Sequence, residues 1–297
     1  MFIDPDILKT ATFLIVDDEP CSTVFFVRWF LGNGLYTYYA VTTRHSIQSP
    51  IVSIRFNLYG GTTQDQFFSR GDWVEYLPSD IAILPLDIAL NSYDVRYLDT
   101  WNFARNKDYL REVALSPISE GRIFSLRYGA GDEIYTLGLF EGHTGQHLAQ
   151  PVVRFGHIAL KPAEGEQILA EIDPPNLTPI DAFLVEMATW QGQSGSPVFL
   201  HVPAALDDQI APPYAQETNY LIGMVQGFYP GYQDVQIDGQ DATLSPLQMG
   251  IGIVIPAKDI GEALSQQPLE DQRERLKNKK QQNPTIRPSA VSINKKC

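Results

Sequence analysis

Cysteine is scarce in this chain, with 2 among 297 residues. Cys297 is the last residue of a polar C-terminal segment, so a native bridge to Cys21 is not expected. A disulfide framework of the kind that stabilises small secreted domains is therefore not expected either. Residues 1–6 also lack the basic region and apolar stretch of a secretory signal. Both absences lead us to expect a reducing, cytoplasmic setting.

Long hydrophobic runs and metal-ligand clusters are missing as well. No run of about 18 apolar residues occurs, so we expect no membrane span. The chain has 5 histidines, and those other than His45 have no spacing with cysteine or glutamate that is typical of a zinc site. His143 and His147 are close in sequence, but the glycines around them favour a loop. We therefore expect neither a metal nor a cofactor.

Basic residues are outnumbered, and the formal net charge is −13. The imbalance is uneven, because residues 266–297 hold eight Lys or Arg against three Asp or Glu, while the rest of the chain has a net charge of −18. An acidic body disfavours nucleic acid and anionic membranes as partners. The basic tail, residues 266–297, has few large apolar residues and is expected to be disordered after its first few residues. It is either a solvated terminus or a docking segment.

Strand-like segments dominate what the chain does contain, and its length suggests about two domains. Helical periodicity is confined to the segment after His45, to residues 104–113 and to residues 257–264. The pattern predicts an all-β protein with a few short helices. Strands are predicted where short runs rich in β-branched and aromatic residues are separated by Gly, Pro, Asn or Asp, at residues 10–16, 24–30, 35–41, 51–58 and 181–187.

Three short motifs carry chemistry, in the order His, Asp, Ser. Residues 42–45 read Thr-Thr-Arg-His, residues 80–84 read Asp-Ile-Ala-Ile-Leu, and residues 192–197 read Gly-Gln-Ser-Gly-Ser-Pro. Taken singly, each has an ordinary explanation: a surface histidine, the start of a strand and a glycine-rich turn. A nucleophile elbow of the α/β-hydrolase type is excluded, because it needs Gly-x-Ser-x-Gly and a histidine that follows the serine.

Together the motifs resemble the three landmarks of the trypsin/chymotrypsin-like serine peptidases, T-A-A-H, D-I-A-L and G-D-S-G-G-P, in the same order. The resemblance is to the compact bacterial members in particular, and it covers about residues 10–258. It implies a double six-stranded antiparallel β-barrel with a few short helices and a polar C-terminal tail. It also implies a serine endopeptidase that acts on a protein or peptide. The expected domains are an N-terminal barrel, residues 1–112, which carries His45 and Asp80, and a C-terminal barrel, residues 113–265, which carries Ser194. The basic tail follows them.

The resemblance assigns Ser194 as the nucleophile, His45 as its base and Asp80 as the group that orients the histidine. A serine hydroxyl needs such a base at neutral pH, and an imidazole both accepts the proton and returns it to the leaving amine. The backbone N–H groups of Gly192 and Ser194 would form the oxyanion hole. In the family the aspartate also accepts hydrogen bonds from the amides of the histidine and of the residue before it, here Arg44.

The resemblance places the base of the specificity pocket at Ala188, with walls formed by residues 222–227 and 250–256. Because no acidic residue lies at the base, we expect a small or apolar substrate residue before the scissile bond (P1). A neighbouring strand segment should pair with the extended substrate backbone, along Gln226, Gly227 and Phe228.

Gln193 departs from the family pattern, which has aspartate before the serine. An amide cannot pair with a newly liberated amino terminus as that aspartate does, so activation by proteolysis of the trypsin kind is not expected. Two alternatives stay open. The cleft could hold a peptide without cleaving it, or activity could require a partner or the tail to reorder the turn around Gln193.

Overall fold

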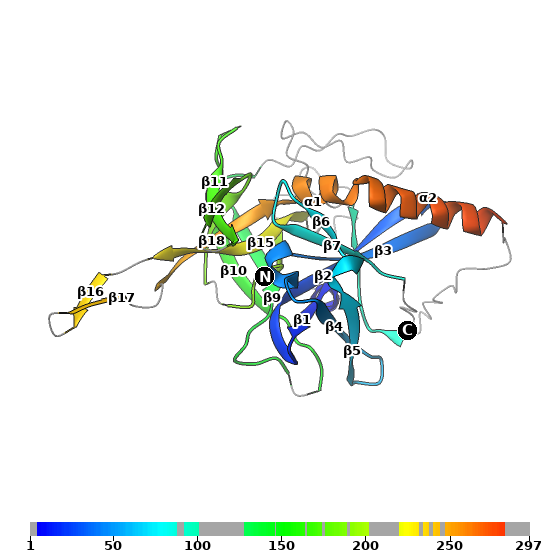
Figure 1. Cartoon of the computed structure of the whole chain (residues 1–297), viewed down its shortest axis with the longest axis horizontal. Helices are drawn as coiled ribbons and strands as arrows, with labels where there is room; N and C mark the ends of the chain where they lie inside the picture. Colours follow the sequence, from blue (N-terminus) through cyan, green and yellow to red (C-terminus); the bar gives the residue numbers. More distant parts are fainter. Residues whose placement is uncertain are drawn as a thin grey trace, which may run out of the picture.

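Two β-sheets lie side by side and make up most of the protein, with two helices along one edge (Figure 1).

Two expectations fall outside the residues that the structure describes. They are the domain boundary at residues 112 and 113 and the helix at residues 104–113. None of the described helices has both the length and the apolar character needed to cross a bilayer. The computed structural model describes residues 5–87, 92–100, 128–145, 147–163, 165–173, 176–188, 191–201, 220–231, 234–237, 240–243 and 247–282.

The N-terminal sheet is larger and more open than the sequence suggested. Its strands follow the order β5-β4-β1-β2-β3-β7-β6, and β8 pairs with β2. Within the described residues β5 and β6 are its free edges, so it is not the closed six-stranded barrel that we expected. Strands β6 and β8 have only 3 and 2 residues, too few for a period-two pattern to show. The eight strands are β1 (Ala11–Val16), β2 (Glu19–Gly32), β3 (Leu35–Thr42), β4 (Ile51–Asn57), β5 (Thr63–Ser69), β6 (Val74–Tyr76), β7 (Ile81–Pro85) and β8 (Leu98–Asp99).

The C-terminal sheet closes into a six-stranded barrel, as predicted, in the order β10-β13-β18-β15-β14-β9. Buried apolar side chains fill its interior, among them Ile134, Ile158, Val185 and Val198. The closed barrel and the open N-terminal half-barrel together confirm the predicted double-barrel class, with one of the two barrels open within the described residues. The barrel strands are β9 (Glu133–Gly138), β10 (Val152–Leu160), β13 (Phe183–Met187), β14 (Pro197–Leu200), β15 (Tyr220–Gly231) and β18 (Leu247–Pro256). Two further hairpins are β11 (Ile168–Asp173) with β12 (Asn176–Ile180), and β16 (Asp234–Ile237) with β17 (Gln240–Thr243).

Both sheets contribute to one buried cluster at the seam between them. Phe25 and Val41 of the N-terminal sheet belong to the same cluster as Tyr135 and Phe199 of the barrel. Tyr135 and Phe199 stack with ring centroids 5.0 Å apart. Burial of a large apolar side chain contributes about 1.5 to 3 kcal/mol. A site at this seam is therefore held by packed side chains from both sheets.

Two of the three predicted helical segments lie in the described residues, and both form; the short 3₁₀ turns η1 (Pro5–Thr10) and η3 (Arg70–Asp72) were not predicted. Helix α1 (Ala257–Leu264) follows β18 and spans the predicted residues. Its buried side chains include Ile260 and Leu264, which lie one helical turn apart on the face that packs against the seam cluster. The segment after the third strand forms a 3₁₀ turn, η2 (Arg44–Ile47). This turn carries the motif histidine.

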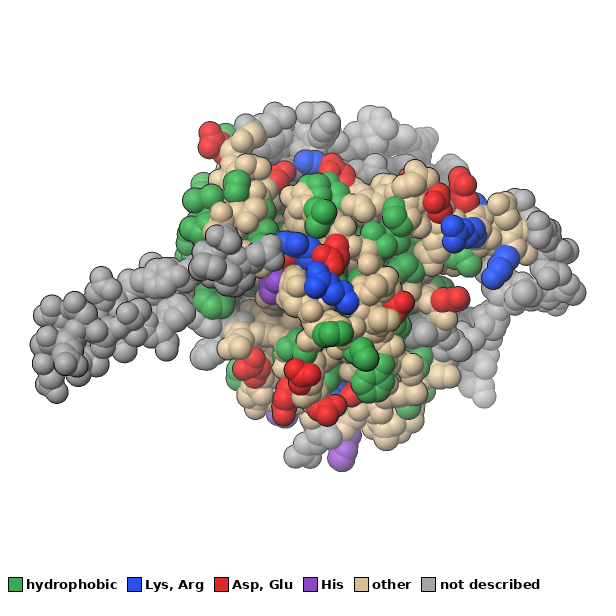
Figure 2. Space-filling model, in the orientation of Figure 1, with side chains coloured by type: hydrophobic (Ala, Val, Ile, Leu, Met, Phe, Trp, Pro, Cys, Tyr) green, Lys and Arg blue, Asp and Glu red, His purple; other side chains and the backbone are tan. Residues whose placement is uncertain are grey.

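Residues 267–282 form a second helix, α2 (Gln267–Gln282), so the expectation of disorder is wrong for this part of the tail. Leu269 is fully buried, and Arg273 donates a hydrogen bond to the Tyr39 hydroxyl at 3.2 Å. The Arg273 guanidinium also lies over the ring of Trp29, 4.3 Å from its centroid. Acidic and basic side chains mix on the rest of the helix (Figure 2). Only Leu269 and Arg273 hold this otherwise polar helix, and two buried side chains do not produce an amphipathic pattern in the sequence. The sequence therefore contains no sign of a helix here. The rest of the tail lies outside the described residues.

Candidate active site

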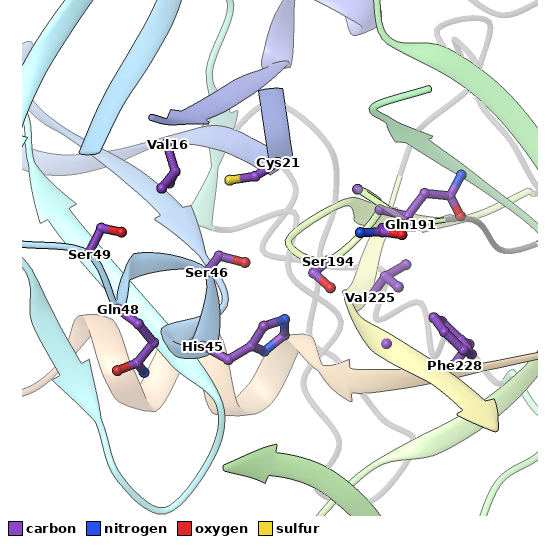
Figure 3. A pocket seen from close by; sticks show the side chains of 13 residues that line it. Val16, Cys21, His45, Ser46, Gln48, Ser49, Gln191, Ser194, Val225 and Phe228 are labelled. Carbon is purple, nitrogen blue, oxygen red and sulfur yellow. The ribbon is translucent and has the colours of Figure 1, made fainter. Parts of the chain in front are cut away.

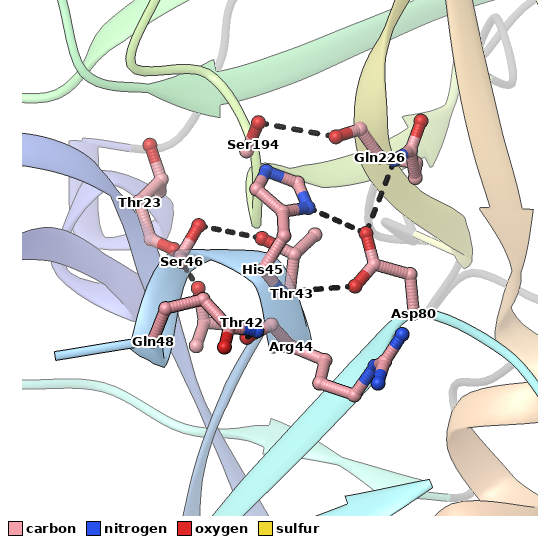
Figure 4. Close-up of polar contacts among 10 residues, drawn as sticks. All are labelled: Thr23, Thr42, Thr43, Arg44, His45, Ser46, Gln48, Asp80, Ser194 and Gln226. Carbon is pink, nitrogen blue, oxygen red and sulfur yellow. Dashed lines mark hydrogen bonds and ion pairs between the residues drawn. The ribbon is translucent and has the colours of Figure 1, made fainter. Parts of the chain in front are cut away.

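His45 and Asp80 come from the N-terminal sheet and form a hydrogen-bonded pair (Figure 4). His45 lies in η2 just after β3, and Asp80 directly precedes β7. Because β3 and β7 are paired strands, these flanking residues are brought together. His45 Nδ1 lies 2.5 Å from Asp80 Oδ2, and the His45 backbone N–H donates to Oδ1 at 3.0 Å. The two bonds fix the ring and turn its other nitrogen, Nε2, away from the carboxylate.

The Asp80 side chain is fully buried, whereas that of His45 is 30% exposed. Burial by itself would raise the pKa of Asp80. The hydrogen bond and the charge of His45, together with a hydrogen bond from the Gln226 amide at 3.1 Å, outweigh burial and lower the pKa below its usual value. Asp80 is therefore ionised at neutral pH. The Arg44 amide, which we expected to bind this carboxylate, donates instead to the Asp80 backbone carbonyl at 3.3 Å.

Ser194 lies in a glycine-rich turn that leads into β14. Gly192 and Gly195 have φ angles of 89° and 85°, in the left-handed region that other residues rarely adopt. A Cβ atom on Gly195 would lie 2.0 Å from the backbone oxygen of Thr23. One on Gly192 would lie 2.7 Å from the side chain of Leu139. The turn therefore needs both glycines to hold Ser194 against the N-terminal sheet.

The Ser194 hydroxyl donates a hydrogen bond to the backbone carbonyl of Gln226 at 3.1 Å, and not to His45. In Figure 4 the imidazole lies between the Asp80 carboxylate and Ser194, so the three side chains converge at one place. The hydroxyl must leave the Gln226 carbonyl before it can donate a hydrogen bond to His45. The structure thus brings the three motif residues together, with the serine turned to a neighbouring acceptor.

Thr23 of β2 ties this turn to the N-terminal sheet. Its backbone N–H donates to the Ser194 carbonyl at 2.9 Å, and its hydroxyl donates to the Gly192 carbonyl at 3.1 Å. The same hydroxyl accepts hydrogen bonds from the backbone of Leu139 and from the Ser196 hydroxyl. Thr23 is fully buried, so these bonds are shielded from water. Sequence reasoning missed Thr23 and the role of Ser196, because no local pattern joins residues so distant in the chain.

The candidate oxyanion donors are the backbone N–H groups of Gly192 and Ser194. Neither has a hydrogen-bond acceptor among the described residues, whereas the next amide, of Gly195, donates to the Val225 carbonyl at 2.8 Å. The amide of Ser196 closes the turn on the Gln193 carbonyl at 2.9 Å. The turn thus satisfies its structural amides and leaves two donors for a bound oxygen.

A cavity of 370 Å³ opens beside Ser194 (Figure 3). The two sheets line it from opposite sides, so a ligand in it would touch both. Of the predicted substrate-binding residues, Gly227 and Phe228 line this cavity; Gln226 directs its side chain to Asp80 instead, and Ala188 does not line it. The lining residues are Val16, Cys21, His45, Ser46, Gln48 and Ser49 on one side, and Gln191, Gly192, Gln193, Ser194, Val225, Gly227 and Phe228 on the other.

Cys21 is a second potential nucleophile at the cavity wall. It is a free thiol whose pKa is raised, chiefly by burial. A thiol with a raised pKa is protonated at neutral pH and does not compete with an activated serine. In the ranges that the structure describes, no group of three or more His, Cys, Asp or Glu side chains is placed to hold a metal ion.

The closed barrel, the adjoining N-terminal sheet and the seam between them define the trypsin-like serine protease fold. The MamO protease domain from Magnetospirillum magneticum, in its apo form, is similar in structure with a TM-score of 0.50. It is 14% identical, and the match covers 88% of this chain and 99% of that one. At this identity the likeness shows the fold alone.

Rv3671c from M. tuberculosis also matches. An inactive form of it gives a TM-score of 0.44 at 16% identity, covering 88% of this chain and 92% of that one. Its active form gives a TM-score of 0.42 at 17% identity, covering 88% and 83%. No protein-family model matches the chain, and no curated protein matches its sequence.

Proposed function

We propose that this protein is a serine endopeptidase that cleaves peptide bonds through an acyl-enzyme on Ser194. The observation that carries the proposal is the buried, ionised Asp80 bonded to Nδ1 of His45, with Nε2 turned toward Ser194 at a cavity. This arrangement directs the second ring nitrogen of His45 to the proposed nucleophile. An ionised carboxylate then stabilises the imidazolium that forms when the ring takes a proton.

In the proposed reaction the Ser194 oxygen attacks the substrate carbonyl carbon while its proton passes to His45 Nε2. The carbonyl π-bond opens, and the resulting oxyanion accepts hydrogen bonds from the N–H groups of Gly192 and Ser194. The intermediate then collapses, and the C–N bond breaks as the leaving amine takes the proton from His45. Water repeats the sequence on the acyl-enzyme and releases the acid.

The hydrogen bond from Ser194 to the Gln226 carbonyl fits this scheme as a resting state. A peptide laid against β15 as an extra strand would use backbone acceptors of this segment, as in β-strand addition. A substrate N–H that binds the Gln226 carbonyl displaces the Ser194 hydroxyl. The hydroxyl then turns to His45, the acceptor on its other side.

Labelling with a fluorophosphonate tests the proposal, because this reagent reacts with serines that a neighbouring base activates. We expect the wild-type protein to be labelled and Ser194→Ala to be unlabelled. Ser265→Ala, which removes an exposed hydroxyl at the end of α1, serves as a matched control and should be labelled like the wild type. Absence of label on folded wild-type protein, or label that persists in Ser194→Ala, would contradict the proposal.

A second candidate is a module that binds peptides without cleaving them. The observation that favours it is the Ser194 hydroxyl turned to Gln226 and not to His45. Peptides bound by the wild type and released intact would support this candidate. An enzyme that a partner activates would instead gain both label and turnover when its partner is added.

Several expectations from the sequence remain predictions. They are that the ligand is a protein or peptide, that the reaction involves no nucleic acid, membrane or cofactor, and that the location is cytoplasmic.

A further inference from the structure

Arg154 is a cation on the inner face of the C-terminal barrel. It stands on β10 opposite Thr136 of β9, and the next pair on this face is Gly156 with Ile134. Side chains of paired residues share one face of a sheet. Thr136 is fully buried, and Ile134 belongs to the cluster that fills the barrel. Arg154 therefore points to the barrel interior, where apolar residues are the rule.

The end of the barrel that holds Arg154 is the end that holds Ser194. The hydroxyl of its neighbour Thr136 donates to the Pro197 carbonyl at 2.8 Å, three residues after Ser194. Arg154 itself donates from Nη1 to the Ala188 carbonyl at 3.3 Å, six residues before Ser194. Val225 belongs to the interior cluster and also lines the cavity beside the serine. Arg154 and Ala188 do not themselves line that cavity, so the guanidinium lies at the same end of the barrel, next to the segment that leads to Ser194.

Arg154 has no carboxylate partner among the described residues. Its contacts are the Ala188 carbonyl and the ring of Phe140, whose centroid lies 5.4 Å from the guanidinium carbon. Its Nε atom is buried without a hydrogen bond. Burial lowers the pKa of Arg154, the direction expected of a cation that has lost water without gaining an anion. A bound carboxylate would compensate for this loss.

We propose that Arg154 is the specificity determinant of the peptidase site and selects substrates with Asp or Glu at P1. The inference rests on the proposed function, because it takes Ser194 as the nucleophile that defines P1. It replaces the small or apolar P1 expected from the sequence. That expectation considered only Ala188 at the base of the specificity pocket. The positive charge beside Ala188 is Arg154, which lies on β10, outside the Ser194 motif.

The long-range field does not supply this preference, because the body of the protein is itself acidic. Attraction of an acidic side chain must therefore come from a local cation. Hydrogen bonds to charged groups contribute about 1.5 to 3 kcal/mol each. We expect a Glu side chain at P1 to be favoured about 10- to 100-fold over its neutral isostere Gln.

Two measurements on the same three peptides, which differ only in Glu, Gln or Lys at P1, test the inference. The first is the dissociation constant for Ser194→Ala, which binds without turnover. The second is kcat/KM of the wild type. We expect Glu to exceed Gln by about 10- to 100-fold in both, and Lys to be the poorest. Arg154→Gln should abolish the difference between Glu and Gln, and Arg154→Lys should keep part of it.

Lys161→Gln is the matched control, because it removes the same charge. Lys161 lies just beyond the other end of β10, about 20 Å along the strand, with its ammonium 4.1 Å from the centroid of the Tyr128 ring. Burial lowers its pKa as well. The preference for Glu should be unchanged in this variant. If Arg154→Gln folds poorly, the charge reversal Arg154→Glu supplies a second test, since it should shift the preference toward Lys.

The outcomes separate this inference from the proposed function. Binding selective for Glu without turnover by the wild type would support the role of Arg154 and contradict the peptidase. Turnover with no preference for Glu would support the peptidase and overturn the role of Arg154. An equal loss for all three peptides in Arg154→Gln would mean that Arg154 only holds the Ala188 carbonyl, and this too overturns the inference. Folded protein that neither binds nor cleaves these peptides contradicts both.

Discussion

The two sheets contribute to the site in different ways. The proposed base lies in the N-terminal sheet, where His45 and Asp80 are joined by two hydrogen bonds at the ends of paired strands. The proposed nucleophile, Ser194, belongs to the barrel, but its turn is held across the seam by Thr23. The pair is therefore set by one sheet, whereas the position of Ser194 depends on both. Changes at the seam should disturb the nucleophile while leaving the base intact.

The largest effect is expected where the two contributions meet. Replacing either Ser194 or His45 by Ala should lower kcat by about 10⁴-fold or more, because each removes the same proton-transfer step. For the same reason the double variant should lose no more than the worse single variant. Peptide hydrolysis by the three purified variants measures this. Losses that multiply would show that the residues act independently and would contradict a shared step.

Thr23→Val should separate the two regions. The variant keeps the shape of the side chain and the backbone hydrogen bond to Ser194 but removes the hydroxyl that binds Gly192, Leu139 and Ser196, so the turn loses the side-chain part of its tie to β2. We expect kcat/KM to fall about 100-fold, as when an oxyanion donor is misplaced. The hydrogen-bonded proton of the His45–Asp80 pair, read by NMR, should be unchanged.

Thr12→Val is its control. Thr12 is a buried residue of β1 whose hydroxyl bonds to the Arg55 carbonyl, within the N-terminal sheet. This variant should lower Tm without lowering kcat/KM. Equal losses of activity in both variants would indicate that general stability, and not the seam contact, controls the turn.

Gln226→Met tests a barrel residue whose side chain bonds to Asp80, the partner of His45. Loss of its hydrogen bond to Asp80 should raise the pKa of that carboxyl, and kcat/KM should fall about 10-fold at neutral pH and further at acidic pH. A carboxyl whose pKa is lower in the folded state than in the unfolded state stabilises the protein at pH values above the unfolded-state pKa. This contribution to the free energy of unfolding is lost as the pH falls through the folded-state pKa. The stability difference between neutral and acidic pH should therefore shrink in this variant.

Gln66→Met controls for the substitution itself, since Gln66 bonds to the Tyr93 hydroxyl in the N-terminal sheet. The pH dependence of its activity and stability should match that of the wild type. An unchanged pH profile in Gln226→Met would remove Gln226 from the account of the base.

The smallest effect on activity is expected at helix α1, away from the seam contacts of the turn. Burial, with the charges of Asp181 and Glu262, raises the pKa of Asp259 to about 7. A raised pKa favours the folded state at low pH, and this contribution is lost as pH rises from about 4 through 7. Asp259→Asn should therefore raise the free energy of unfolding at pH 8 by up to about 4 kcal/mol and change it little at pH 4.

Urea unfolding at both pH values measures this effect, and kcat/KM should stay at the wild-type level. Asp271→Asn, on the neighbouring helix α2, is the control for loss of one negative charge. A stabilisation by Asp259→Asn that is the same at pH 4 and pH 8 would contradict ionisation of Asp259 as its cause.

Local patterns in the sequence predicted the elements that have a local cause. Five strands follow from short runs rich in β-branched and aromatic residues, α1 follows from helical spacing, and the three motifs place His45, Asp80 and Ser194 near the ends of strands. Residues whose partners lie far away in the sequence could not be predicted in this way. Thr23 bonds across the seam and Arg154 bonds within the barrel, both to partners more than 30 positions away, and neither lies in a motif. Helix α2 was missed because two buried side chains hold it, with no apolar stripe.

The rate of fluorophosphonate modification of Ser194, compared between the wild type and His45→Ala, tests the central claim most directly. The claim is that a base held by one sheet activates a nucleophile held by the other. We predict that the wild type is modified at Ser194 alone and that His45→Ala reacts at least about 10³-fold more slowly. Equal rates in the two proteins, with both folded, would contradict the claim.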